Sequence, residues 1–107
     1  MFKSTNNHGF QMTFRNGLTI SVQFGHGNYC ERMHSASKPN QDRFTPIVKS
    51  DNAEIAIWDA DGNLFRFRRD SVEGYCNTDY VAFWIERTQL AANLENLKQI
   101  AAHLELS

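Results

Sequence analysis

The chain has 107 residues, with 11 basic and 12 acidic side chains and a formal net charge of −1. This length suits one domain with one modest core, and the near-neutral charge argues against binding to long nucleic acids. We expect a single domain over residues 1–107, mainly β over 1–75 and helical over 77–107. The sequence has no apolar run of membrane-spanning length and no signal-peptide pattern, which predicts no membrane partner and reduced thiols at Cys30 and Cys76.

Alternating apolar residues predict two strands, one on each side of Asn16-Gly17. A two-residue turn there would pair Phe14 with Thr19 and send the two apolar sets to opposite faces. A three-residue loop instead pairs Phe14 with Leu18 and keeps both sets on one face. The other pairs expected from this register are Met12 with Ile20 and Phe10 with Val22. We therefore predict a three-residue loop closed by Gly17 in the left-handed conformation.

The same pattern recurs in the second half of the chain. A three-residue loop over residues 60–62 places Ile57 opposite Phe65 and Ile55 opposite Phe67. The glycine again closes the loop. Two hairpins with matched apolar faces predict one antiparallel sheet with one covered face.

The period changes from two to that of a helix after Cys76. Asn77 and Asp79 form a helix-start signal, with a capping side chain and an acid in the first turn. Apolar residues then recur at steps of three, four or seven, without Pro or Gly, so one long helix or two abutting helices are expected. The predicted stripe is Tyr80, Phe83, Leu90, Leu94, Leu97, Ala101 and Leu104. Because so long a helix reaches beyond a small sheet, we expect a dimer or higher oligomer through the C-terminal helix.

The remaining segment, between the hairpins, is polar. Residues 31–42 are predicted to be a loop, and residues 44–48 a short strand that Pro46 confines to an edge. The predicted fold class is therefore α+β: an antiparallel sheet of two or more hairpins, followed by one long or two C-terminal helices.

Three constellations suggest catalytic or metal chemistry, and each has a plainer explanation. His26, Cys30 and His34 carry soft ligand atoms at spacings of four, but two glycines disfavour the helix that would bring them together. Residues 59–63 resemble the start of a calcium loop, although the hairpin already accounts for their acids and glycine. Cys30 or Cys76 lacks a local signature that links it to a histidine base. We expect no metal, no cofactor and no enzymatic activity.

Arginines are the candidate phosphate ligands. Arg66 and Arg68 share one face of a predicted strand, opposite Phe65 and Phe67, where a guanidinium fork can match phosphate oxygens or simply face solvent. Arg87 falls where the helical stripe requires an apolar side chain, and a buried arginine needs an anionic partner. That partner is either a ligand phosphate or an internal carboxylate, unless the side chain reaches solvent. The internal candidates are Asp59, Asp61 and Glu86.

The segment FGHGNYCERM, residues 24–33, is dense in unusual residues. Its glycines on either side of His26 allow close backbone approach to a ligand, and exposed N–H groups there suit a phosphate. Tyr29 can stack on a base whose edge Asn28 reads, with Trp84 as a second stacking residue. The alternative is a loop whose backbone conformation requires the glycines, which closes the sheet and places Tyr29 in the core. The predicted ligand-binding residues are Arg87, Arg66, Arg68, Tyr29, Asn28, His26 and Trp84.

Two blocks of the chain resemble a signature of small phage-encoded proteins. They are FxNGxTxSVQFGxGNYC at residues 14–30 and AE-x-A-x-W-D-x-DGN from residue 53, and together they cover about a quarter of the chain. The blocks are similar to those of the first-described family of Thoeris anti-defence sponges. That resemblance implies an N-terminal antiparallel sheet, C-terminal helices, and dimers that assemble further, for example into hexamers. The polar segment 31–42 and the long helical tail are candidate departures, which leaves the ligand specificity open.

The same resemblance implies a function. Members of that family bind cyclic ADP-ribose isomers made by a bacterial immune TIR enzyme and sequester them without cleavage, and some bind cyclic oligonucleotides at a separate site. We therefore expect a sponge for a cyclic nucleotide signal in the host cell cytoplasm, with no partner besides that small molecule and further copies of the chain. The alternatives are a protein-binding inhibitor of a host factor, which would use the helical stripe, and a small phosphodiesterase that degrades such signals.

Overall fold

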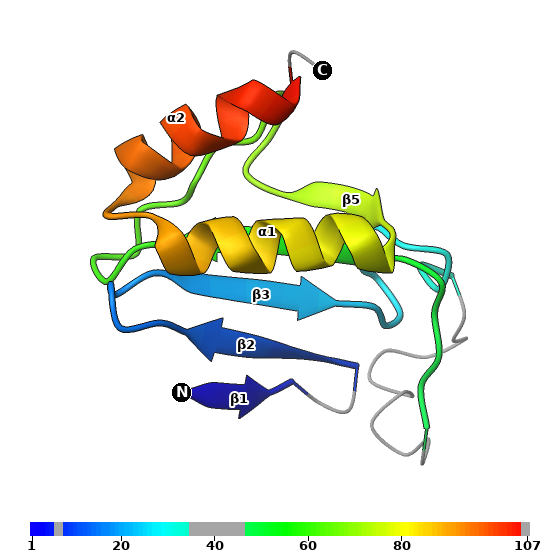
Figure 1. The fold of residues 1–107 in the computed structure, drawn as a ribbon. Helices are drawn as coiled ribbons and strands as arrows, with labels where there is room; N and C mark the ends of the chain where they lie inside the picture. Colours follow the sequence, from blue (N-terminus) through cyan, green and yellow to red (C-terminus); the bar gives the residue numbers. More distant parts are fainter. Residues whose placement is uncertain (6–7, 35–46, 106–107) are drawn as a thin grey trace.

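The computed structural model describes residues 1–5, 8–34 and 47–105, the last three of these by their backbone alone. Within these ranges the chain forms a five-stranded antiparallel sheet followed by two helices, which confirms the predicted α+β class (Figure 1). The strands are β1 (Phe2–Ser4), β2 (Gly9–Thr13), β3 (Thr19–Gln23), β4 (Ala53–Trp58) and β5 (Glu73–Cys76). The helices are α1 (Thr78–Leu90) and α2 (Leu94–Glu105). In the described part of the chain, neither helix is long and apolar enough to cross a membrane.

The strands follow one another across the sheet in chain order, and the first hairpin has the predicted register. Phe10 faces Val22, and the Phe14 N–H donates to the Leu18 carbonyl at 2.9 Å. Gly17 closes the loop with a φ of 88°, the left-handed conformation that a side chain disfavours. The three-residue loop is therefore confirmed.

The predicted register of the second hairpin is confirmed at the turn, but it is wrong for the residues farther from the turn. Gly62 has a φ of 84°, and the Phe65 N–H donates to the Ile57 carbonyl at 2.7 Å. Ile55, however, pairs with Glu73 of β5 and not with Phe67. The returning chain leaves the sheet after one bridge, turns, and comes back as β5 at the same edge. Neither β1 nor β5 was predicted, and of the predicted strand at 44–48 only residues 47 and 48 are described, in no strand.

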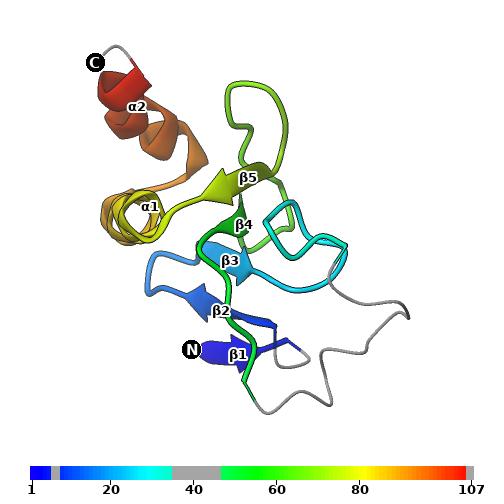
Figure 2. The same ribbon diagram turned by 90° about the vertical axis from the view of Figure 1, so that its right-hand side faces the viewer.

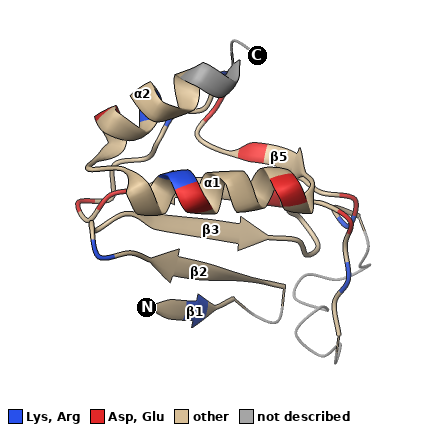
Figure 3. Cartoon of the chain, in the orientation of Figure 1, with Lys and Arg blue, Asp and Glu red and all other residues tan. Residues whose placement is uncertain are grey.

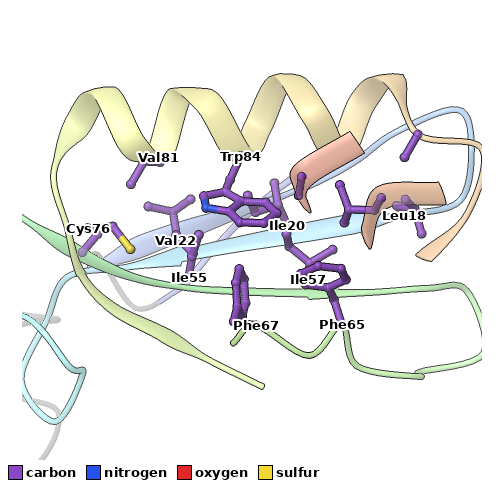
Figure 4. Packing of buried hydrophobic residues seen from close by; sticks show 14 residues of the cluster. Leu18, Ile20, Val22, Ile55, Ile57, Phe65, Phe67, Cys76, Val81 and Trp84 are labelled. Carbon is purple, nitrogen blue, oxygen red and sulfur yellow. The ribbon is translucent and has the colours of Figure 1, made fainter. Parts of the chain in front are cut away.

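Both helices lie on one face of the sheet, as the turned view of Figure 2 shows. The buried side chains of this face come mainly from β3 and β4, and α1 packs across those two strands. Trp84 points down from α1 onto Phe65 and Phe67, with ring centroids 5.5 and 5.0 Å away (Figure 4). The sharp turn of the second hairpin thus returns two aromatic rings to the core.

The buried face of α1 is displaced by one residue from the predicted stripe. The buried residues are Val81, Trp84 and Thr88, whereas the stripe ran through Tyr80, Phe83 and Arg87. One residue is about 100° around a helix, so Arg87 lies at the border of the buried face and not in it. The Thr88 hydroxyl is buried without penalty because it donates to the Trp84 carbonyl at 2.6 Å.

The helical region is broken into two helices at residues 91–93. Ala91 is extended, and the Asn16 amide from the first hairpin donates to the Thr88 and Ala91 carbonyls at 2.8 and 2.7 Å. At the other end of α1, the Asn77 side chain caps the helix as predicted, accepting the Tyr80 N–H at 2.8 Å. The oligomer expected through the C-terminal helix would require its apolar stripe, which includes Leu97, to be partly exposed in a single chain. Leu97 is instead fully buried in the chain's own core, so this expectation is wrong for Leu97.

Candidate functional site

A groove of about 450 Å³ lies between α1 and the strands β2 and β3. It exists because the sheet is wider than the helix that covers it: five strands about 4.8 Å apart span roughly twice the diameter of a helix. Since α1 packs on β3 and β4, the apolar residues nearer β2 keep an open side. The walls of the groove are Phe10, Val22 and Phe24 on the sheet side and Val81, Ala82 and Ile85 on α1.

The segment before β4 forms a polar rim along this groove. It contributes residues 48–53, of which Lys49 and Asp51 are the charged side chains that line the groove in the described part of the chain. Ser50 is engaged within the segment, because its hydroxyl donates to the Asn52 carbonyl at 2.6 Å. The groove therefore combines apolar walls with one cation and one anion at its rim.

Cys76 lines the same groove as a neutral thiol. It is 3% exposed, and burial, followed by the nearby carboxylates of Glu73 and Glu54, raises its pKa to about 12. Its Sγ lies 3.4 Å from the Glu73 carbonyl oxygen. The side chain is therefore a poor nucleophile at neutral pH and contributes apolar surface.

The loop at residues 25–34 does not offer the cradle of free N–H groups that its glycines suggested. Its amides are largely used within the protein: the Gly25 N–H donates to Asn28 Oδ1 at 3.0 Å, and the Gly27 N–H to the Met33 carbonyl at 3.0 Å. The Asn28 side chain thus stabilises the conformation of the loop. Tyr29 is exposed rather than in the core, and its main chain lies against Gly74 of β5, where a Cβ atom would stand 2.7 Å from the Tyr29 Cβ.

The loop is fastened to the rim of the groove. The Glu31 N–H donates to Asn52 Oδ1 at 2.7 Å, and Glu31 Oε1 in turn accepts the Asp51 N–H at 2.8 Å. The Tyr29 N–H donates to Glu54 Oε2 at 2.9 Å. Figure 2 places this loop and the helices on opposite sides of the sheet, with the segment before β4 between them. The loop therefore holds the backbone of the groove's rim, a role that the sequence analysis did not predict.

The predicted arginines lie away from the groove. Arg87 pairs with Glu86 at 2.7 Å, in the adjoining basic and acidic parts of α1 seen in Figure 3, and its guanidinium lies over the Phe83 ring at 4.7 Å. Of the partners left open for Arg87, the internal carboxylate Glu86 is the one present, and the expectation that Arg87 is buried in the apolar stripe is wrong. Arg66 and Arg68 are exposed opposite the buried Phe65 and Phe67, as the alternation predicted.

None of the seven predicted ligand residues lines the groove. Trp84 is 2% exposed and packed in the aromatic cluster of the core, so a ligand cannot stack on it. His26 and Tyr29 lie in the loop on the other side of the sheet. The sequence carries no signal for the groove, because most of its residues are ordinary apolar side chains, and Lys49 and Asp51 lie in a polar segment with no motif.

The metal and calcium alternatives gain no support from the geometry. Within the described residues, no three side chains of His, Cys, Asp or Glu are grouped to hold an ion. Hydrogen bonds from the side chain and backbone of Asn63 lower the pKa of Asp59, which fixes this carboxylate in the hairpin turn. No family model, curated protein or solved structure matches the chain.

Proposed function

We propose that the protein binds a cyclic nucleotide immune signal and sequesters it without cleavage, as a phage anti-defence sponge in the host cell cytoplasm. The resemblance of the two sequence blocks to the Thoeris anti-defence sponges supports the ligand class. The groove beside α1 supports the site. The ligand is a cyclic ADP-ribose isomer or, alternatively, a cyclic oligonucleotide.

The composition of the groove is the observation that carries this proposal. Its volume of about 450 Å³ falls in the range of about 300–1,000 Å³ typical of small-molecule sites. Phe10 and Phe24 supply aromatic rings and Ile85 an aliphatic side chain to the walls that would contact a base, and Lys49 at the rim supplies an ammonium for a phosphate. A site with apolar walls and a few polar groups at its rim matches an amphipathic ligand of this kind.

Calorimetry against cyclic ADP-ribose isomers and cyclic di- and trinucleotides tests the function, and a substitution in the groove tests the site. Ala82 is exposed and lines the groove, so Ala82→Trp fills the space without disturbing the core. We expect this variant to weaken binding at least tenfold. Gln89→Trp, on an exposed position of the same helix outside the groove, is the matched control and retains wild-type affinity.

The state of the recovered ligand separates the proposal from its alternatives. A sequestered ligand returns intact after heat denaturation of the complex. Return of a hydrolysed product would instead establish a phosphodiesterase. Absence of binding to every member of the panel would overturn the proposal and favour a protein-binding inhibitor.

A further inference from the structure

We propose that Asp51 determines which ligand the groove accepts, by receiving a hydrogen bond from the exocyclic amino group of a purine. This inference rests on the proposed function. It assigns a ligand-selecting role to a residue that no motif marks and that lies outside the two family-like blocks.

The backbone on both sides of Asp51 is fixed by hydrogen bonds. The Asp51 N–H donates to Glu31 Oε1 at 2.8 Å, and Asn52 Oδ1 accepts the Glu31 N–H at 2.7 Å, so the two segments hold each other reciprocally. Ser50 adds a third bond, to the Asn52 carbonyl. These contacts use the backbone N–H of Asp51, and Asp51 is the one acidic residue that lines the groove in the described chain.

An ionised carboxylate accepts hydrogen bonds and donates none, so its partner in the ligand must be a hydrogen-bond donor. In this proposal the face of the base lies against the apolar walls of the groove, so that its edge reaches the rim with Asp51. An adenine edge offers the two N–H donors of its amino group. Hypoxanthine carries a carbonyl oxygen at the same place, which would face the carboxylate as a second acceptor, and any N1–H donor lies beside that position and not at it. Lys49, on the same rim, provides the cation for the phosphate, so the two charges recognise different parts of one nucleotide.

Two ligand pairs test this selection in the whole protein: cyclic ADP-ribose and cyclic di-AMP, each against its hypoxanthine counterpart. We expect the wild type to prefer the amino ligands by about tenfold to a hundredfold, the usual range for a hydrogen bond to a charged group. Asp51→Asn should abolish or invert this preference, because its amide can donate to the hypoxanthine oxygen. Asp61→Asn, an exposed acid outside the groove, is the matched control and should retain the preference.

Glu31 is the positioning residue in this scheme, and its variants give a second readout. Glu31→Gln keeps an acceptor for the Asp51 amide and should keep the preference for amino ligands. Glu31→Ala releases that amide, so the preference should narrow and hydrogen exchange at Asp51 should accelerate. A Glu31→Ala protein with unchanged exchange and unchanged preference would remove Glu31 from the scheme.

The outcomes separate this inference from the proposed function. If no cyclic nucleotide binds, both are overturned. If one binds but Ala82→Trp leaves its affinity unchanged, the proposed function stands, while the groove as its site and the role of Asp51 are overturned. If Ala82→Trp abolishes binding but the amino and hypoxanthine ligands bind equally to the wild type, the groove stands as the site and the role of Asp51 is overturned. Loss of all binding in Asp51→Asn, with both ligand types affected equally, would also overturn selection by the amino group.

Discussion

Gly17 and Gly62 show how a single residue fixes the geometry of a hairpin. Each has a φ above 80°, and a Cβ atom at Gly62 would meet nothing within 4 Å, so the demand for glycine there is conformational and not steric. We predict that Gly62→Val costs about 1–2 kcal/mol in the free energy of unfolding, because the left-handed region excludes a β-branched side chain. Urea denaturation measures this loss.

Gly62→Asn is the control for that experiment, since asparagine tolerates positive φ better than other side chains. Its stability should lie closer to that of the wild type. Gly17→Val should behave like Gly62→Val, since its Cβ atom would lie 3.8 Å from that of Ala60, an ordinary contact. Equal stability of the wild type and both valine variants would contradict the register argument.

At the residue scale, local patterns predicted the turns but not the surroundings of polar side chains. Asn16 was read as a turn residue, and it also caps the end of α1, a contact across 72 residues of sequence. The spacing left open whether a ligand phosphate or an internal carboxylate pairs with Arg87, and in the structure its neighbour Glu86 supplies the charge. Both contacts depend on how a helix is rotated about its axis and placed on the sheet, which the spacing of residues leaves open.

The rotation of α1 has a measurable consequence for stability. Trp84 is buried among aromatic rings, whereas Arg87 is partly exposed and paired at the surface. We predict that Trp84→Ala lowers the free energy of unfolding by about 3–5 kcal/mol, and that Arg87→Ala lowers it by less than about 1 kcal/mol. Urea unfolding followed by circular dichroism compares the two variants. A cost for Arg87→Ala as large as that for Trp84→Ala would place Arg87 back in the buried face.

The strand β5 escaped prediction for a physical reason. Residues 73–76 of β5 contain no alternating apolar pair, and Tyr75 adopts a φ of 55°, which is rare for a residue with a side chain. The strand forms because β4 leaves unpaired backbone groups at its edge and the loop at Tyr29 offers a carbonyl to the Tyr75 N–H at 2.8 Å. A strand stabilised by its neighbours carries little signal of its own.

At the scale of the whole molecule, the candidate site follows from the different widths of the two layers. The apolar alternation correctly predicted which residues of β2, β3 and β4 share a face. It did not predict that α1 would cover β3 and β4 and leave the residues of β2 beside a groove. That result depends on the position of one helix relative to five strands, which is a property of the assembled core.

The same uneven coverage leads to the prediction that the chain self-associates. Phe2 and Leu90 are 76% and 65% exposed, and Phe10, Met12 and Phe14 of the uncovered flank are only partly buried. Exposed apolar surface of this kind often marks an interface between chains. Leu90 at the end of α1 replaces Leu97 as the contact expected in the helical region.

We predict a sedimentation mass that is a multiple of the 12.3 kDa chain at micromolar concentration. Leu90→Lys should shift the mass towards one chain, while Gln89→Lys at the neighbouring exposed position should not. A soluble wild-type protein with the mass of a single chain at that concentration would contradict the prediction, and the apolar flank would then be open surface in solution.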